Sequence, residues 1–257
     1  MTKDYSIQTV QNAMQILRLF NAEKDEWTLT EIAQAKAMSI STTKRLLDIL
    51  EVYGYLTKGA GGLKKYRLGL SVLKLSGIVK TRFEITKEAQ QLLNKLLEDF
   101  VETVHIGVLE GTHTVYLDKL DSRYPVHLST YIGKQSPVYC TGCGKVMMAF
   151  KNKKEQDEII QQIVNEGFYP FTSKTVRNAA ELREHLLQIK KQGYAASTDE
   201  YQEGITSIAA PIYDYNDTVA AAISVTGPTK RMEIPEIIEG VVKTANEFSK
   251  SMGYIPN

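Results

Sequence analysis

The apolar and polar positions between residues 28 and 69 predict two helices followed by a hairpin. The second helix has the clearer pattern. At about 100° per residue, its apolar and polar positions fall on opposite sides. The apolar side holds Thr43, Leu46, Leu47, Leu50 and Tyr53. The polar side holds Ser41, Lys44, Arg45 and Asp48, and Ser39 stands in front of the helix as a favourable N-cap. This helix is therefore expected to bury a leucine-rich face and to present hydroxyl and basic groups outward.

The segments on either side of this helix complete a small unit. Residues 29–33 mark a short preceding helix, with Thr28 or Thr30 as its cap and Met38 in the turn between the helices. After the second helix, residues 55–57 and 65–68 have strand patterns, and a glycine-rich turn at 59–62 joins them. Two helices and a basic hairpin are the layout of a winged helix-turn-helix, which places its second helix in the major groove of DNA. The second helix alone would fit an ordinary amphipathic surface helix equally well, so its neighbours decide the interpretation.

The rest of the chain mixes helical and strand patterns. Val10, Ala13, Met14, Leu17 and Phe20 predict a first helix, whose apolar stripe is either extra core or a surface for a second copy. Residues 70–80 continue helically, and the polar stretch at 81–86 predicts a domain boundary crossed by a stiff helical linker. Further helices are expected at 87–100, 144–150, 155–165, 179–192 and 235–252, and strands at 101–109, 114–120, 125–131, 207–213 and 218–226. This arrangement predicts an α+β fold with domains at residues 1–80 and 81–257.

Charge distinguishes the two predicted domains. The 257 residues carry a net charge of only +1. However, residues 1–80 hold 12 basic and 7 acidic side chains (+5), whereas residues 81–257 hold 19 and 23 (−4). A basic N-terminal domain on a mildly acidic body fits phosphate binding by the first domain alone. The sequence has no run of 18 apolar residues, no signal-peptide core at its N-terminus, and two cysteines, too few for a disulfide framework. We therefore expect a cytoplasmic protein that does not enter a membrane.

Several stretches resemble, in order, the IclR family of bacterial transcriptional regulators. They are LTEIA at 29–33, STTKRLL at 41–47, YRLG at 66–69, ETVH at 102–105, GK at 144–145, and the segments 204–211 and 222–228. The resemblance covers nearly the whole chain. It departs at Ala37-Met38, where the family usually carries Gly-Leu, so a slightly different turn is expected there.

The resemblance implies an N-terminal winged helix-turn-helix, a helical linker and a C-terminal GAF-like effector-binding domain. It also implies a sequence-specific DNA-binding regulator, expected to be a repressor and not an enzyme. Such a protein would bind a palindromic operator in double-stranded DNA as a homodimer or homotetramer, and no cofactor is expected. The side chains suited to phosphates and base edges are Thr30, Ser39, Ser41, Thr42, Lys44, Arg45, Lys64, Lys65 and Arg67.

Small and hydroxyl residues cluster in four segments of the body, 139–145, 197–200, 204–207 and 224–226. Backbone N–H groups at the start of a helix near Gly142 would suit an anion, and uncharged hydroxyls nearby would suit a small carboxylate. In the family, matching positions line an effector pocket. Carried over to this chain, they are Leu128, Gly142, Cys143, Ser197, Ser207, Ser224 and Thr226. The alternative is that these small residues merely allow tight packing. If Ser224 binds the ligand, Ser224→Ala should blunt the response and leave DNA affinity unchanged.

Cys140 and Cys143 form a CxxC pair that leaves a second hypothesis open. It could serve a thiol- or metal-responsive sensor, although a zinc site would need two more ligands. His105 lies in an apolar strand and has the pattern of a core histidine. Asp199, Glu200 and Glu203 have the pattern of loop charges or caps, because no partner histidine or metal set accompanies them.

Overall fold

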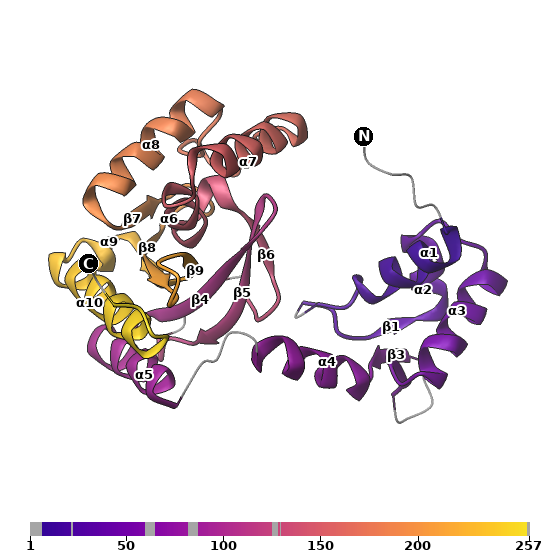
Figure 1. Cartoon of the computed structure of the whole chain (residues 1–257). Coiled ribbons are helices and arrows are strands. Elements are labelled where there is room, and N and C mark those ends of the chain that lie inside the picture. Colours follow the sequence, from indigo (N-terminus) through magenta and orange to yellow (C-terminus); the bar gives the residue numbers. More distant parts are fainter. Residues whose placement is uncertain are drawn as a thin grey trace. The chain divides into compact units, whose positions relative to one another are not determined.

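The computed structural model describes residues 7–21, 23–59, 65–81, 87–124, 128 and 130–255. They belong to two compact units, Met1–Phe83 and Glu84–Asn257 (Figure 1). The first unit contains α1 (Gln8–Leu17), β1 (Trp27–Thr28), α2 (Leu29–Ala35), α3 (Ile40–Val52), β2 (Leu56–Lys58), β3 (Lys65–Leu68) and α4 (Leu70–Thr81). No helix in the described part of the chain is long and apolar enough to cross a membrane.

Local hydrogen bonds fix the start of both helices of the helix-turn-helix. Thr28 caps α2 in a reciprocal arrangement: its hydroxyl accepts from the Glu31 N–H at 3.3 Å, and its own N–H donates to the Glu31 carboxylate at 2.7 Å. Thr28, rather than Thr30, is therefore the cap. Ser39 caps α3 as predicted, with its hydroxyl accepting from the Thr42 N–H at 3.1 Å.

The leucine-rich face of α3 is buried as the periodicity predicts. Thr43, Leu46, Leu47 and Leu50 face the core of the first unit, where Ile16 and Ile32 meet them. Tyr53 was wrongly assigned to this face: its side chain is 69% exposed, because the helix ends at Val52 and Tyr53 is the residue that follows. The outward side of α3 is thereby left to polar and basic residues.

The hairpin forms a three-stranded sheet in the order β1-β3-β2, all antiparallel. The extra strand, β1, comes from two residues directly before α2 that have no strand pattern of their own. It pairs Trp27 with Tyr66, which ties the start of the helix-turn-helix to the hairpin. Residues 60–64, which include most of the turn predicted at 59–62 and the predicted contact residue Lys64, lie outside the described residues.

The apolar stripe predicted on α1 is rotated relative to the observed one. Ile16, which is not part of the predicted stripe, is fully buried, whereas Val10 and Met14 are 51% and 56% exposed. Phe20 is buried just beyond the end of the helix. The first helix therefore contributes its C-terminal end to the core and leaves apolar side chains near its N-terminal end facing outward.

The turn between α2 and α3 keeps a left-handed residue although it lacks glycine. Ala37, where the family usually carries Gly, has φ of +51°. A side chain in this region costs about 1–2 kcal/mol relative to right-handed backbone. The departure seen in the sequence is therefore accommodated by strain at Ala37, while the turn itself stays tight.

Ala37→Gly is accordingly expected to stabilise the first unit. Relief of the left-handed strain should exceed the greater flexibility of glycine in the unfolded chain, with a net gain of about 0.5–1 kcal/mol. Trp27, the only tryptophan in the sequence, makes its fluorescence a reporter of urea unfolding in this unit. A matched control is Ala35→Gly, which lies in α2 and should destabilise by about 1 kcal/mol instead. Destabilisation by both changes would show that Ala37 is unstrained.

The second unit is built on a six-stranded antiparallel sheet in the order β6-β5-β4-β9-β8-β7. Its strands are β4 (Thr103–Glu110), β5 (His113–Leu120), β6 (Gln135–Pro137), β7 (Ala195–Thr198), β8 (Ile205–Tyr213) and β9 (Val219–Pro228). Its helical elements are α5 (Lys87–Phe100), the short helix η1 (Val138–Cys140), α6 (Gly142–Ala149), α7 (Lys153–Glu166), α8 (Ala179–Gln192), α9 (Thr229–Met232) and α10 (Pro235–Ser251).

One strand and one helix start predicted for this unit need correction. The strand expected at 125–131 is not observed where it can be judged: Leu128, Thr130 and Tyr131 lie outside strands, and 125–127 and 129 lie outside the described residues. The edge position beside β5 belongs instead to β6, whose proline and short length gave no strand signal. In addition, α6 begins at Gly142, two residues earlier than predicted.

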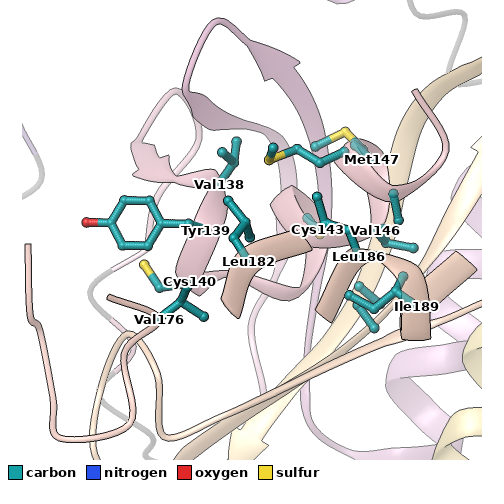
Figure 2. Packing of buried hydrophobic residues seen from close by; sticks show 14 of the residues in the cluster. Val138, Tyr139, Cys140, Cys143, Val146, Met147, Val176, Leu182, Leu186 and Ile189 are labelled. Carbon is teal, nitrogen blue, oxygen red and sulfur yellow. The ribbon is translucent and has the colours of Figure 1, made fainter. Parts of the chain in front are cut away.

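The two faces of the sheet carry different helices. α10 packs against β8, β9 and α5 on one face, and α6 packs against β4, β8 and β9 on the other (Figure 1). Glycines allow the close approach of α6. A Cβ on Gly142 would lie 2.9 Å from the Ser207 hydroxyl oxygen, and one on Gly107 would lie 3.3 Å from Cys143 Cβ. Side chains of α6, η1 and α8 then form a dense apolar cluster (Figure 2).

Candidate functional site

The outward side of α3 offers one arginine that the described protein does not neutralise. Lys44 pairs with Asp48 on the same helix, and Lys58 of β2 pairs with Glu51. Arg45 is exposed and has no ion-pair partner among the described residues. Its guanidinium can donate two parallel hydrogen bonds to a guanine edge or a phosphate.

The other predicted contact residues in the described part of the chain are also accessible, but two of them are ion-paired. Thr30, Ser39, Ser41 and Thr42 are exposed at the N-terminal ends of α2 and α3. Lys65 and Arg67 on β3 both pair with Glu26, and their hydrogen bonds hold the pKa of that carboxyl below its usual range. Together these three side chains carry one net positive charge. The hairpin is therefore less basic than the sequence suggested. Arg45 is the strongest candidate for a direct contact with DNA.

In the second unit, one pocket lies over the sheet face that α6 covers. About 480 Å³ of the space within it is free of protein atoms, part of it open to solvent. Strand pairing explains its composition: Ser197, Ser207, Thr226 and Thr103 are consecutive cross-strand neighbours on this face. The lining residues are His105, Tyr116, Leu128, Thr130, Cys140, Thr141, Ser197, Tyr201, Gln202, Ile205, Ser207 and Thr226.

Four of the seven predicted effector residues line this pocket: Leu128, Ser197, Ser207 and Thr226. The structure places the other three directly behind it. Gly142 backs onto Ser207, and Cys143 lies buried between α6 and β4. Ser224 is buried beneath α6, where its side chain hydrogen-bonds the Cys143 thiol.

Five lining residues lie outside the four segments selected from the sequence and were not carried over from the family: His105, Tyr116, Thr130, Tyr201 and Gln202. His105 was available from strand alternation, because it pairs with Ser224 across β4 and β9 and so shares a face with Thr226. The other four had no comparable signal. Tyr116 is shifted by a bulge in the pairing of β4 with β5, and Thr130, Tyr201 and Gln202 reach the pocket from irregular segments.

Three of the pocket hydroxyls already donate within the protein. Ser197 donates to the Cys140 carbonyl at 3.0 Å, Thr141 to the Pro137 carbonyl at 3.0 Å, and Thr226 to the Ser207 hydroxyl oxygen at 3.0 Å. Ser207 accepts from Thr226, and its own hydroxyl donates to no other residue in the described part of the chain. Because Thr141 does not cap α6, the first-turn N–H groups of that helix also lack a side-chain acceptor. The pocket therefore presents donors from Ser207 and, beside it, from the start of α6.

His105 is an uncharged member of the pocket. Its side chain is buried, and burial, followed by the nearby charge of Lys119, lowers its pKa to about 3. One ring nitrogen, Nε2, lies 2.9 Å from the Thr130 hydroxyl, while Nδ1 has no hydrogen-bond partner in the described protein. The ring also lies 4.8 Å from that of Tyr116, centroid to centroid.

This pKa leads to a pH-dependent contribution to stability. In the unfolded chain the pKa of His105 is near 6.5. On acidification the unfolded state therefore binds a proton at a pH where the folded state does not. The free energy of unfolding should fall between about pH 6.5 and pH 3 from this residue alone. His105→Gln removes the contribution, so the wild type should lose stability relative to the variant between pH 7.5 and pH 5. Thermal unfolding at both values measures this, with His185→Gln as control. A constant difference between wild type and His105→Gln would contradict a buried neutral imidazole.

The two cysteines do not have the surroundings of a reactive thiol. Both are free and buried within the cluster of Figure 2. Burial raises the pKa of Cys140 well above the usual range and that of Cys143 to about 11. No group of three or more potential metal ligands occurs among the residues described. A thiolate, needed for both redox and metal chemistry, is thus disfavoured at either position.

The acidic segment expected to be loop charges contains a buried ion pair instead. Lys145 of α6 pairs with Glu200, and their side chains are 2% and 7% exposed. The Thr175 hydroxyl also donates to the Glu200 carbonyl at 2.6 Å. Glu200 directly precedes the pocket residues Tyr201 and Gln202, so the pair connects α6 to one wall of the pocket.

Comparison with known proteins identifies the family. The profile described as "IclR helix-turn-helix domain" matches residues 9–60, and that described as "Bacterial transcriptional regulator IclR C-terminal" matches residues 78–250. The HTH-type transcriptional regulator XynR of Escherichia coli is 30% identical over 251 residues, covering 96% of this chain and 98% of XynR. The chain belongs to the IclR family of bacterial transcriptional regulators.

Solved structures agree with this membership. The crystal structure of the Thermotoga maritima IclR matches with a TM-score of 0.76 at 28% identity, covering 96% of this chain and 99% of that one. An IclR homolog from Microbacterium hydrocarbonoxydans, complexed with 4-hydroxybenzoate, shares the fold with a TM-score of 0.82 at 22% identity, covering 95% and 98%.

The family assignment confirms the central prediction from the sequence. This IclR-family protein is a DNA-binding transcriptional regulator, not an enzyme, with an N-terminal helix-turn-helix domain and a C-terminal effector-binding domain. The confirmed fold class is α+β with the helix-turn-helix first.

Proposed function

We propose that this IclR-family protein represses transcription by binding a palindromic operator as a homodimer, the dimer being able to pair further into a homotetramer. In each protomer α3 enters the major groove, and β2 and β3 contact the flanking backbone. The observation that carries this proposal is the exposed, unpaired Arg45 on the side of α3 opposite its buried leucines. Two such helices would read half-sites about 34 Å apart, or a multiple of that distance.

Exposed apolar side chains support a dimer formed through the first unit. On α1, Val10 and Met14 face outward, and on α4 so do Leu70 and Leu73, which are exposed by 82% and 67%. Apolar residues at this spacing on two helices need cover in solution, and a second copy provides it through a symmetric contact. A DNA-binding dimer of this kind acts where the chromosome is, so we place the protein in the cytoplasm.

For the second unit we propose a small carboxylate effector in the pocket beneath α6. The Ser207 hydroxyl and the uncapped start of α6 are the donors for its carboxylate, and Tyr116, Leu128 and Ile205 contact its apolar part. A relative that shares this fold was solved with 4-hydroxybenzoate, a small carboxylate of the class proposed here. Effector binding would shift the populations of the arrangements that the two DNA-binding units of the dimer can adopt. This shift would change the affinity for the operator.

The proposal is tested by fluorescence anisotropy on the intergenic DNA beside the protein's own gene. Operator DNA should bind about 10³-fold or more tightly than a scrambled duplex, with a steep dependence on salt. Weak and equal binding on both duplexes, followed by no enriched sequence in a selection from random DNA, would refute the proposal.

Ser207→Ala should weaken the effector response by about tenfold, because it removes the pocket hydroxyl whose proton is not engaged elsewhere. Ser224→Ala is the control variant, because Ser224 is buried beneath α6 beside Cys143 and does not line the pocket. The measurement is the carboxylate concentration that half-releases the operator. A larger loss in Ser224→Ala than in Ser207→Ala would place the effector elsewhere.

A further inference from the structure

The pocket contains a buried polar atom that its protein surroundings leave unsatisfied. His105 is 2% exposed and lines the pocket, and its Nδ1 has no hydrogen-bond partner among the described residues. Buried polar atoms in folded proteins are nearly always paired, because an unpaired one costs about 1–3 kcal/mol. An unpaired nitrogen on the wall of a ligand pocket indicates a partner that arrives with the ligand.

The surroundings of the ring define the chemistry of that partner. The described lining of the pocket contains no lysine or arginine. Lys119, whose charge acts on the His105 ring, is already engaged by the Thr130 carbonyl at 2.8 Å and by Asp121 at 2.7 Å. The ring itself is neutral and lies against Tyr116. A second carboxylate placed here would lose its hydration without gaining a counter-charge, whereas a neutral group would lose far less.

A hydroxyl is the neutral group that matches a ring of either tautomer. The Thr130 hydroxyl can donate to Nε2 or accept from it, so Nδ1 is either an N–H donor or a lone-pair acceptor. A ligand hydroxyl can do both, and therefore pairs with Nδ1 in either case.

We infer that His105 is a specificity-determining residue that selects effectors carrying a hydroxyl group in addition to their carboxylate. This inference rests on the proposed effector site and adds the class of ligand, a hydroxy acid. The carboxylate end lies toward Ser207 and the start of α6, and the hydroxyl lies against His105 Nδ1. His105 and Thr226 share one face of the sheet, since Thr103 pairs with Thr226 and His105 pairs with Ser224, so both ends of one small acid can be held at once.

The test uses three matched pairs of acids that differ by one hydroxyl: lactate and propionate, 3-hydroxybutyrate and butyrate, and 4-hydroxybenzoate and benzoate. Affinities for the full-length wild type are measured by isothermal titration calorimetry. In at least one pair the hydroxylated acid should bind about tenfold more tightly, the effect of one well-formed buried hydrogen bond. Equal binding within all three pairs, or no binding of any acid, overturns the inference.

Three substitutions then assign the preference to Nδ1. His105→Phe keeps an aromatic ring at this position and removes both nitrogens. His105→Gln places an amide near the position of Nε2, and His105→Asn places one near Nδ1. The preference, taken as the ratio of the two affinities within a pair, should fall to within about twofold in the first two variants and persist in His105→Asn. A preference that survives in His105→Phe refutes the role of His105.

Two controls separate this result from folding and from the proposed function. His185→Gln, at a half-buried histidine on α8 outside this pocket, should leave every ratio unchanged. Operator affinity without acid, measured by anisotropy, should be equal in wild type and variants. Loss of operator binding in the wild type would count against the regulator proposal alone, whereas loss of the hydroxyl preference with operator binding intact would count against His105 alone.

Discussion

Lys145→Met should lower the free energy of unfolding of the second unit by about 3–5 kcal/mol, the usual cost of removing one partner from a buried ion pair. The lysine side chain is 2% exposed, and the change leaves the Glu200 carboxylate, 7% exposed, without its cation. The second Glu200 oxygen already has no hydrogen-bond partner in the described protein, so nothing nearby can replace the lost contact. The buried charge, rather than the lost packing, is the source of the destabilisation.

The two-unit organisation gives this measurement an internal control. Trp27 fluorescence follows unfolding of the first unit, and far-UV circular dichroism follows both units. In Lys145→Met only the dichroism transition should move to lower urea. Lys174→Met removes a comparable but 60% exposed partner of Asp199 and should change stability by less than about 1 kcal/mol.

Replacing both partners distinguishes an unpaired charge from a general packing defect. Lys145→Met combined with Glu200→Leu should recover most of the stability lost in the single variant, because apolar pairs of similar volume often substitute for buried ion pairs. A double variant no more stable than Lys145→Met would contradict this account. Because Glu200 precedes Tyr201 and Gln202, the single variant should also bind effector more weakly than the double variant does.

Features encoded by neighbouring residues could be predicted from the sequence. The Ser39 cap and the hairpin strands depend on residues close by in the sequence, and helical periodicity marks the buried leucines of α3. The four proposed effector residues that line the pocket came from a family resemblance, and three of them, Ser197, Ser207 and Thr226, form a row of cross-strand neighbours. Their role in effector binding stays a prediction.

Features that depend on distant partners could not be predicted. Glu200 has the pattern of a loop charge until α6 brings Lys145 to it from 55 residues away. Lys65 and Arg67 have the pattern of free phosphate contacts until β1 places Glu26 beside them, about 40 residues earlier in the chain. In each case a charge was judged by its neighbours in sequence, whereas its partner is set by packing.

Arg45→Ala should reduce specific operator binding by about 30-fold or more while changing binding to random DNA much less. One bidentate contact between arginine and guanine is worth about 1–3 kcal/mol, and the proposed dimer makes it twice. The other cations on this surface hold weaker positions, since Lys44 pairs with Asp48 and Lys58 pairs with Glu51. Of the two cations on α3, Lys44 and Arg45, only Arg45 has no ion-pair partner among the described residues.

Two further variants separate base reading from simple charge. Arg45→Lys keeps the charge and loses the planar fork, so the slope of affinity against salt should stay near that of the wild type while discrimination against scrambled DNA falls. Asp25→Ala, an exposed change in the same unit before β1, should leave specific binding essentially unchanged. Anisotropy on operator and scrambled duplexes across a salt series measures all three variants. Equal losses in Arg45→Ala and Asp25→Ala would exclude α3 as the reading helix. If Arg45→Lys instead binds the operator like the wild type, the arginine contacts phosphate, and sequence must be read by the exposed hydroxyls of Ser41 and Thr42.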